Sequence, residues 1–257
     1  MNTGRMNKDM KEGPFYVGYL AVLPSGLRVF LISVAAGLLG MSAALALAIG
    51  AAQDDPGPGT FLWGAGAQTV TGIVEVKPYP LLHVSKGSAR IPAGQTIMLS
   101  NPFKNGAQQR LDKYDGQVVT LRGIALKRGD IDFLQVGRAT ATDEVAELPA
   151  RQSLGRWRLK GEICDGKCLA GAMRPSRGIS HRACANLCLI GGIPPVFVSS
   201  APVDGRDFFL MADKDGAPLH ERYLKYVALF VSLDGEIERR GNLLIFKVDL
   251  DSLKVLP

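Results

Sequence analysis

The sequence contains few cysteines, few histidines and few aromatic side chains. Among its 257 residues are 4 Cys and 3 His, and aromatic residues make up 7%. Cysteines this sparse exclude a small scaffold held together by disulfides alone, and a hydrophobic fraction of 47% excludes a disordered chain. The net charge of +6 is modest and the basic residues are scattered, so we expect no nucleic-acid partner.

The common catalytic motifs are also missing. His220-Glu221 begins like the zinc-protease helix motif, but Leu224 occupies the position of the second histidine. The chain contains no G-x-S-x-G elbow, no P-loop and no complete dinucleotide fingerprint. The sequence therefore favours a protein without enzymatic activity, and it indicates no catalytic or organic-cofactor-binding residue.

One long hydrophobic run lies near the N-terminus. Residues 29–52 carry no charge, and as a helix they span roughly 36 Å, which is enough to cross a hydrocarbon core of ~30 Å. Basic residues precede the run and two aspartates follow it, so the positive-inside rule places residues 1–28 in the cytoplasm. We expect a single-pass protein of the bacterial inner membrane with residues 53–257 in the periplasm. A cleaved signal peptide is the alternative.

The exported part contains an internal repeat. Val119–Gly123 aligns with Val231–Gly235, and the segments that follow these two also align without a gap. Further upstream, Val70–Gly72 matches Leu159–Gly161. A duplicated β unit explains these matches, and repeats of this kind determine the interpretation of the whole fold. The repeat predicts equivalent strand positions for Gly72, Gly123, Gly161 and Gly235.

Strand-like segments separated by turn residues indicate a mainly β fold. Each repeat is expected to form a five-stranded β-barrel that resembles the OB-fold, with a helical turn before the fourth strand at Gln108–Tyr114 and Leu219–Tyr226. Another small barrel or a sandwich is the alternative. The predicted organisation is a linker over 53–66, a first barrel over 67–150 and a second barrel over 151–257.

All four cysteines fall in an insertion over 164–192 that only the second repeat contains. Ser180–Ile190 is predicted to be a helix, with Ser180 as its N-cap and a Gly-Gly pair as its end. One face of this helix carries a histidine and two cysteines, and we expect it to approach the two cysteines of the preceding strand and turn. The candidate metal ligands are Cys164, Cys168, Met173, His181, Cys184 and Cys188.

The cysteines allow several interpretations. In the periplasm, four cysteines favour two structural disulfides, with three possible pairings. This interpretation describes a membrane-anchored accessory, assembly or scaffold protein with a protein partner in a membrane or redox complex. Alternatively, thiolates beside an imidazole and a thioether suit copper or zinc, which indicates a metal-binding or electron-transfer protein. A thiol–disulfide enzyme with Cys184 as its reactive thiolate is a third hypothesis.

Two resemblances accompany these residues. The C-x3-C spacing of Cys184 and Cys188 is similar to that of the binuclear copper site in cytochrome oxidase subunit two and of Sco-type copper chaperones. In the oxidase pattern a histidine follows, and here that position is Gly192. The segments HRACANLC and GGIPPVFV, within residues 157–257, resemble bacterial membrane-anchored periplasmic proteins of uncharacterised function with tandem OB-like domains. This second resemblance implies no activity.

Overall fold

A computed structural model describes residues 24–52 and 57–257, which belong to two separate compact units. The first unit contains one helix, α1 (Ser25–Ala52), which is long and apolar enough to cross a membrane and buries none of its side chains. This helix confirms the predicted apolar helix at the N-terminal end. Most of the predicted cytoplasmic segment and the first part of the predicted linker lie outside the described residues.

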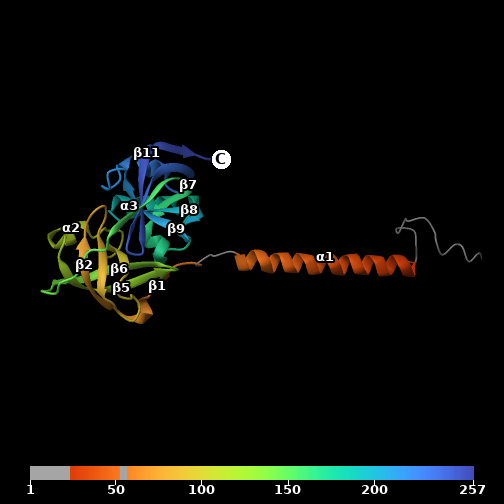
Figure 1. Cartoon of the computed structure of the whole chain (residues 1–257), viewed down its shortest axis with the longest axis horizontal. Helices are drawn as coiled ribbons and strands as arrows, with labels where there is room; N and C mark the ends of the chain where they lie inside the picture. Colours follow the sequence, from red (N-terminus) through yellow and green to blue (C-terminus); the bar gives the residue numbers. More distant parts are fainter. Residues whose placement is uncertain (1–23, 53–56) are drawn as a thin grey trace, which may run out of the picture. The chain divides into compact units, whose positions relative to one another are not determined.

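The second unit begins with a six-stranded sheet (Figure 1). Strand β5 pairs with β2 on one side and with β6 on the other, so that β2 to β6 form a closed circuit of pairings. Strand β1 adds to this circuit by pairing with β5. The strands are β1 (Thr60–Phe61), β2 (Gln68–Glu75), β3 (Leu81–Lys86), β4 (Thr96–Ser100), β5 (Val118–Arg128) and β6 (Ile131–Ala141).

The second sheet is a closed barrel with the same strand order. In each circuit the third and fifth strands are parallel, β4 with β6 and β9 with β11, and the other neighbours are antiparallel. The predicted mainly β fold built from a repeated unit is therefore confirmed. The strands are β7 (Arg151–Asp165), β8 (Pro195–Val203), β9 (Arg206–Asp213), β10 (Phe230–Arg240) and β11 (Leu243–Val255).

Short helical turns precede the fourth strand of each circuit, as predicted. Helix α2 (Gln108–Leu111) and the 3-10 turn η4 (Asp112–Tyr114) lead into β5. The 3-10 helix η7 (Glu221–Tyr226) leads into β10. Each turn buries one side chain in the core of its own sheet, Leu111 in the first and Tyr223 in the second, and neighbouring residues of each turn pack against that core.

The strand register confirms the predicted equivalence of the glycines. Gly72 lies opposite Val119 in the first sheet, and Gly161 lies opposite Val231 in the second. A Cβ atom on Gly72 would overlap the carbonyl oxygen of His83, and one on Gly161 would overlap that of Val198. The same crowding therefore selects glycine at both positions. The second equivalent pair, Gly123 and Gly235, lies opposite Val136 and Val248.

Part of the linker predicted over 53–66 belongs to the folded unit. Thr60 and Phe61 pair with Lys127 and Leu126 of β5, and a 3-10 turn η3 (Trp63–Ala65) follows. A threonine and an aromatic residue are good strand formers, and here they complete the outer edge of a sheet. The short strand was not predicted because the segment before it is rich in Gly and Pro, which is typical of a tether.

The two sheets share a hydrophobic core. One cluster of buried side chains contains Leu81 and Phe133 from the first sheet together with Val196 and Ile245 from the second. A buried ion pair also joins them, because Arg240 Nη1 lies 2.8 Å from Glu75 Oε1. The sheets consequently form one compact unit, and a site at their junction can use side chains from both.

Candidate metal centre

The cysteine-bearing insertion follows β7. It consists of a π-helical turn η5 (Cys168–Ala172), a 3-10 turn η6 (Ile179–His181) and the helix α3 (Arg182–Ile190). The predicted helix is confirmed from Arg182 onward, but Ser180 does not cap it, because Ser180 lies inside η6 and His181 is the N-cap residue. Gly191 ends the helix, and its N–H donates to the carbonyl of Leu187.

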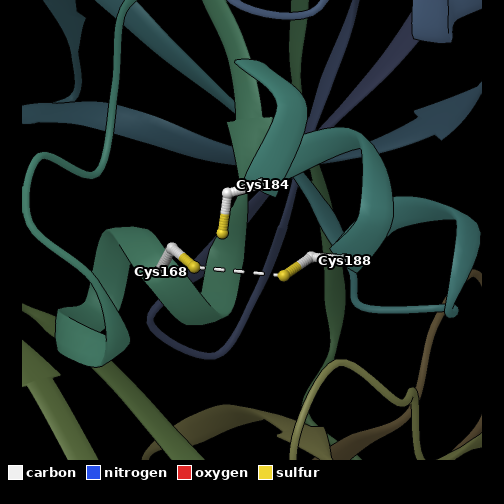
Figure 2. A group of neighbouring side chains, drawn as sticks. All are labelled: Cys168, Cys184 and Cys188. Atoms are coloured by element: carbon white, nitrogen blue, oxygen red, sulfur yellow. Dashed lines mark hydrogen bonds between the residues drawn. The ribbon is translucent and has the colours of Figure 1, made fainter. Parts of the chain in front are cut away.

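Three cysteine sulfurs meet at this insertion (Figure 2). The sulfurs of Cys168, Cys184 and Cys188 all lie within 4.8 Å of one another. Cys168 comes from η5, and the other two lie one turn apart on α3. The sulfurs of Cys168 and Cys188 are 4.0 Å apart. All four cysteines of the chain are free thiols.

A buried carboxylate–histidine pair, Asp165 and His181, lies next to Cys168. Asp165 accepts the backbone N–H of Cys168 through Oδ1 at 2.8 Å, and its Oδ2 lies 3.1 Å from His181 Nε2. Both side chains are almost completely buried. The Cys168 sulfur, a carboxylate oxygen of Asp165 and a ring nitrogen of His181 lie within 4.8 Å of one another. His181 therefore faces Cys168 but lies outside the three-sulfur group.

The first sheet contributes a lysine to the thiol cluster. Lys104 lies between β4 and α2, and its Nζ donates to Cys184 Sγ at 2.8 Å and to Cys188 Sγ at 3.6 Å. An ammonium group at this distance stabilises negatively charged sulfur. The site is consequently built from both sheets, with the sulfurs on one and the nearest cation on the other.

Further contacts fasten the loop that carries Lys104, residues 101–106. Lys167, next to Cys168 in the chain, donates from Nζ to the carbonyl oxygens of Asn101 at 2.8 Å and Phe103 at 2.7 Å. At the far end of the loop, the N–H of Gly106 donates to the carbonyl of Gly191 at 2.8 Å. The 101–106 loop is therefore held at both of its ends by the cysteine-bearing insertion.

The contacts around the sulfurs separate the pKa values of two cysteines. The hydrogen bond from the Cys168 thiol lowers the pKa of Cys188, and the nearby Lys104 ammonium acts in the same direction against the effect of burial. The same hydrogen bond, together with burial, raises the pKa of Cys168. Burial also lowers the pKa of Lys167 to about 8. Within this pair, Cys188 is the sulfur that ionises first.

A pocket of about 620 Å³ opens onto the thiol cluster. Cys168 and Cys188 line it, and Lys104 stands beside them. The rings of Phe61 and Trp63 stack at its side with their centroids 4.5 Å apart. Met173, a predicted ligand, and Phe103 complete its apolar lining. The cluster is therefore reached through a largely hydrophobic opening.

Cys164 does not join the other cysteines. It is buried in the core shared by the two sheets and belongs to neither group of candidate ligands. Burial holds the pKa of its thiol well above the usual value. Side chains alternate along a strand, so Cys164 of β7 faces this shared core whereas its neighbour Ile163 faces the core of the second barrel. The expected approach of α3 is thus realised toward Cys168 and not toward Cys164.

Two residues of the site were not predicted from the sequence. Asp165 stands inside the segment Cys-Asp-Gly-Lys-Cys, and its position between two candidate ligands was the available signal. Lys104 is far from every cysteine in the sequence, and only the packing of the two sheets brings it to the sulfurs.

Comparisons of the chain with protein families, with curated proteins and with solved structures find no match. The geometry of the thiol cluster is therefore the basis for a functional assignment.

Proposed function

We propose that this chain is a membrane-tethered protein that binds monovalent copper through Cys168, Cys184 and Cys188. The observation that supports this proposal is the convergence of three sulfurs within 4.8 Å. A metal ion that is about 2.3 Å from each thiolate sulfur separates those sulfurs by roughly 4 Å. The 4.0 Å between Cys168 and Cys188 matches that spacing, whereas a disulfide requires a sulfur–sulfur distance of about 2.05 Å.

The donor set favours copper over zinc. Thiolates are soft ligands and suit Cu(I). Structural zinc sites use four ligands, and within residues 24–52 and 57–257 the group that includes Cys184 and Cys188 offers three. The candidate donors beside this group are Asp165 and His181, which are paired with each other and lie within 4.8 Å of the Cys168 sulfur. Zinc is the alternative, and it requires one of these two residues to become a fourth ligand.

The surrounding charges suit a negatively charged metal–thiolate centre. Three thiolates around Cu(I) leave a net negative charge, and the ammonium group of Lys104 offsets part of it from 2.8 Å. The 101–106 loop therefore positions this cation next to the sulfurs. Met173, in the lining of the pocket, supplies a thioether on the path by which a copper ion reaches the cluster.

The location and the fold belong to the same proposal. We propose that α1 stays in the bacterial inner membrane with its N-terminal end toward the cytoplasm, and that the copper site lies in the periplasm. The basic residues before the helix and the aspartates after it support this orientation. The shared strand order, with parallel third and fifth strands, supports OB-like barrels. We propose for this chain the role of an accessory protein that exchanges copper with a protein partner in a membrane or redox complex.

The test is an anaerobic competition titration of Cu(I) against a chromogenic chelator, with the reduced full-length protein in detergent. We expect one copper ion per chain. Loss of an outer-shell residue at a metal site typically weakens affinity by about 10–100-fold, so loss of a direct ligand in Cys188→Ser or Cys168→Ser should weaken it by at least about 100-fold. Cys164→Ser is the matched control and should bind like the wild type. Equal affinity in all four proteins would overturn the proposal.

A further inference from the structure

We propose that Cys188 and Cys168 also form a dithiol centre that reduces disulfide substrates. Cys188 is the attacking sulfur, Cys168 is the resolving sulfur, and the Asp165–His181 pair accepts the proton of Cys168. This activity goes beyond copper binding, and it gives the buried carboxylate–histidine pair a chemical role that the three-sulfur group does not give it.

The first support is the position of the two sulfurs. They lie 4.0 Å apart on two different segments, η5 and α3. A disulfide requires about 2.05 Å, so the two sulfurs must approach each other by roughly 2 Å to form the bridge. Cys184 and Cys188 lie on the same helix, one turn apart, and a bridge between them would distort that helix. The favoured partner of Cys188 is therefore Cys168.

The second support is access from outside. Cys168 and Cys188 both line the pocket, and neither Cys164 nor Cys184 does. A substrate disulfide that enters this pocket therefore meets the sulfurs of Cys168 and Cys188. The pocket combines the apolar side chains of Phe61, Trp63 and Phe103 with two lysines, Lys104 and Lys167, so it suits a disulfide that carries apolar or anionic groups.

The third support is the charge beside Cys188. Lys104 Nζ lies 3.6 Å from Cys188 Sγ and lines the same pocket. A cation next to a cysteine favours the thiolate, which is the nucleophile in thiol–disulfide exchange. The same ammonium group stabilises the thiolate that leaves the substrate, since that leaving group departs into the pocket beside it.

The fourth support lies on the other side of Cys168. The Asp165 carboxylate is anchored by the N–H of Cys168 at 2.8 Å, and it is paired with His181 at 3.1 Å. Both groups lie within 4.8 Å of the Cys168 sulfur and are shielded from solvent. A buried acid–base pair at this distance can take the proton from the resolving thiol as that thiol attacks.

The reaction has two steps. In the first, the Cys188 thiolate attacks one sulfur of the substrate R–S–S–R, the substrate bond breaks, and the products are Cys188–S–S–R and RS⁻. In the second, Cys168 gives its proton to the Asp165–His181 pair and attacks Cys188 Sγ, so that the second RS⁻ leaves. The substrate is reduced to two thiolates, which take up protons, and the two cysteines are oxidised to one disulfide. A dithiol reductant restores the starting state by the reverse exchange.

The test uses the reduced, metal-free full-length protein in detergent, with oxidised glutathione as the probe. The reaction is quenched by alkylation, and peptide mass spectrometry identifies the linked cysteines. In the wild type we expect one disulfide, between Cys168 and Cys188. Cys168→Ser should stop after the first step and accumulate a glutathione adduct on Cys188. Cys164→Ser is the control that keeps both reacting sulfurs, and it should still form the bridge.

The acid–base role has its own readout. Asp165→Asn should leave formation of the Cys188 adduct unchanged and slow its conversion to the disulfide by at least about tenfold, since general base catalysis typically contributes 10²–10⁴-fold. His181→Gln should slow the same step and serves as the second variant if Asp165→Asn does not fold. A bridge that contains Cys184 or Cys164, or no reaction at Cys188, would overturn the proposal. Copper titration of the same reduced protein is a separate measurement. Failure of disulfide reduction therefore does not contradict copper binding, and failure of copper binding does not contradict disulfide reduction.

Discussion

At the scale of single residues, the site depends on one contact that crosses between the sheets. Lys104 is the cation nearest to Cys184 and Cys188, and it contributes to the lowered pKa of Cys188 together with the Cys168 hydrogen bond. Removing a cation from beside a thiolate raises the pKa of the thiol. The charge on Lys104, and not only the packing of its stem, is therefore expected to control how readily Cys188 ionises.

We predict that Lys104→Met shifts the ionisation of Cys188 to higher pH. The measurement is the ultraviolet absorbance of the thiolate as a function of pH in the reduced protein. Lys104→Arg should keep most of the wild-type titration, because it retains the positive charge. Lys113→Met removes an exposed lysine of η4 and should leave the thiolate titration unchanged. A titration of Lys104→Met that matches the wild type would show that the Lys104 contact has no influence on the thiols.

At the scale of the elements, the internal repeat explains which parts of the fold were predictable. Strands β5 and β10 occur in matched sequences, and their glycines and apolar positions predicted the strands and their equivalence. The sequence predicted that the insertion contains a helix with two cysteines, but not where that helix begins. Ser180 has the side chain of a good N-cap, but it lies inside η6, and α3 starts one residue later than predicted, with His181 as its N-cap residue. The approach of Lys104 depends on the packing of two sheets, which no local pattern encodes.

The close approach of strands at Gly72 gives a test of the repeat. Gly72→Ala places a methyl group against the carbonyl oxygen of His83, so we predict that it lowers the free energy of unfolding by about 1–3 kcal/mol. Gly64→Ala is the matched control, since a Cβ at Gly64 meets no atom within 4 Å. Both values come from denaturant unfolding followed by circular dichroism. Equal stability of the two variants would contradict the described strand register.

At the scale of the whole molecule, the two sheets are held together by a buried charge network. Arg240 of the second barrel contacts Glu75 of the first at 2.8 Å and also bonds to Glu238. Glu75 also contacts Arg151 at 2.7 Å and Glu238 also contacts Lys247 at 3.2 Å. Loss of Arg240 therefore leaves neither carboxylate without a cation and should cost about 1–3 kcal/mol, as for a buried group that loses one hydrogen bond. We predict that Arg240→Met lowers the free energy of unfolding by that amount. A loss below about 1 kcal/mol in urea unfolding would show that the network contributes little.

The same network predicts a dependence of stability on acid. Burial alone would raise the pKa of Glu75, but the hydrogen bond from His83 and the charge of Arg240 outweigh it, and the pKa lies below its ordinary value of 4.5. A carboxylate with a lowered folded-state pKa contributes stability above its unfolded-state pKa and loses it as the pH falls through the folded-state value. We therefore expect Glu75→Gln to flatten the loss of stability below about pH 5, as measured by urea unfolding across that range. A parallel pH dependence in both proteins would contradict this role.

The orientation of the chain is also a whole-molecule prediction. The charges that flank α1 predict that the second unit lies in the periplasm. Alkaline phosphatase fused after residue 60 should therefore be active, and the mature protein should retain α1 when its N-terminus is sequenced. An inactive fusion would contradict the orientation, and a mature N-terminus near Gln53 would contradict the anchor.

The thiolate copper site is tested most directly by X-ray absorption spectroscopy at the copper edge of the loaded, reduced protein. The proposed site predicts a first shell of three sulfurs at about 2.3 Å and no nitrogen or oxygen ligand. Cys188→Ser should remove one sulfur from that shell, whereas Cys164→Ser should leave the spectrum unchanged. A shell dominated by nitrogen or oxygen, or a shell that is identical in the wild type and in Cys188→Ser, would contradict copper binding by Cys168, Cys184 and Cys188.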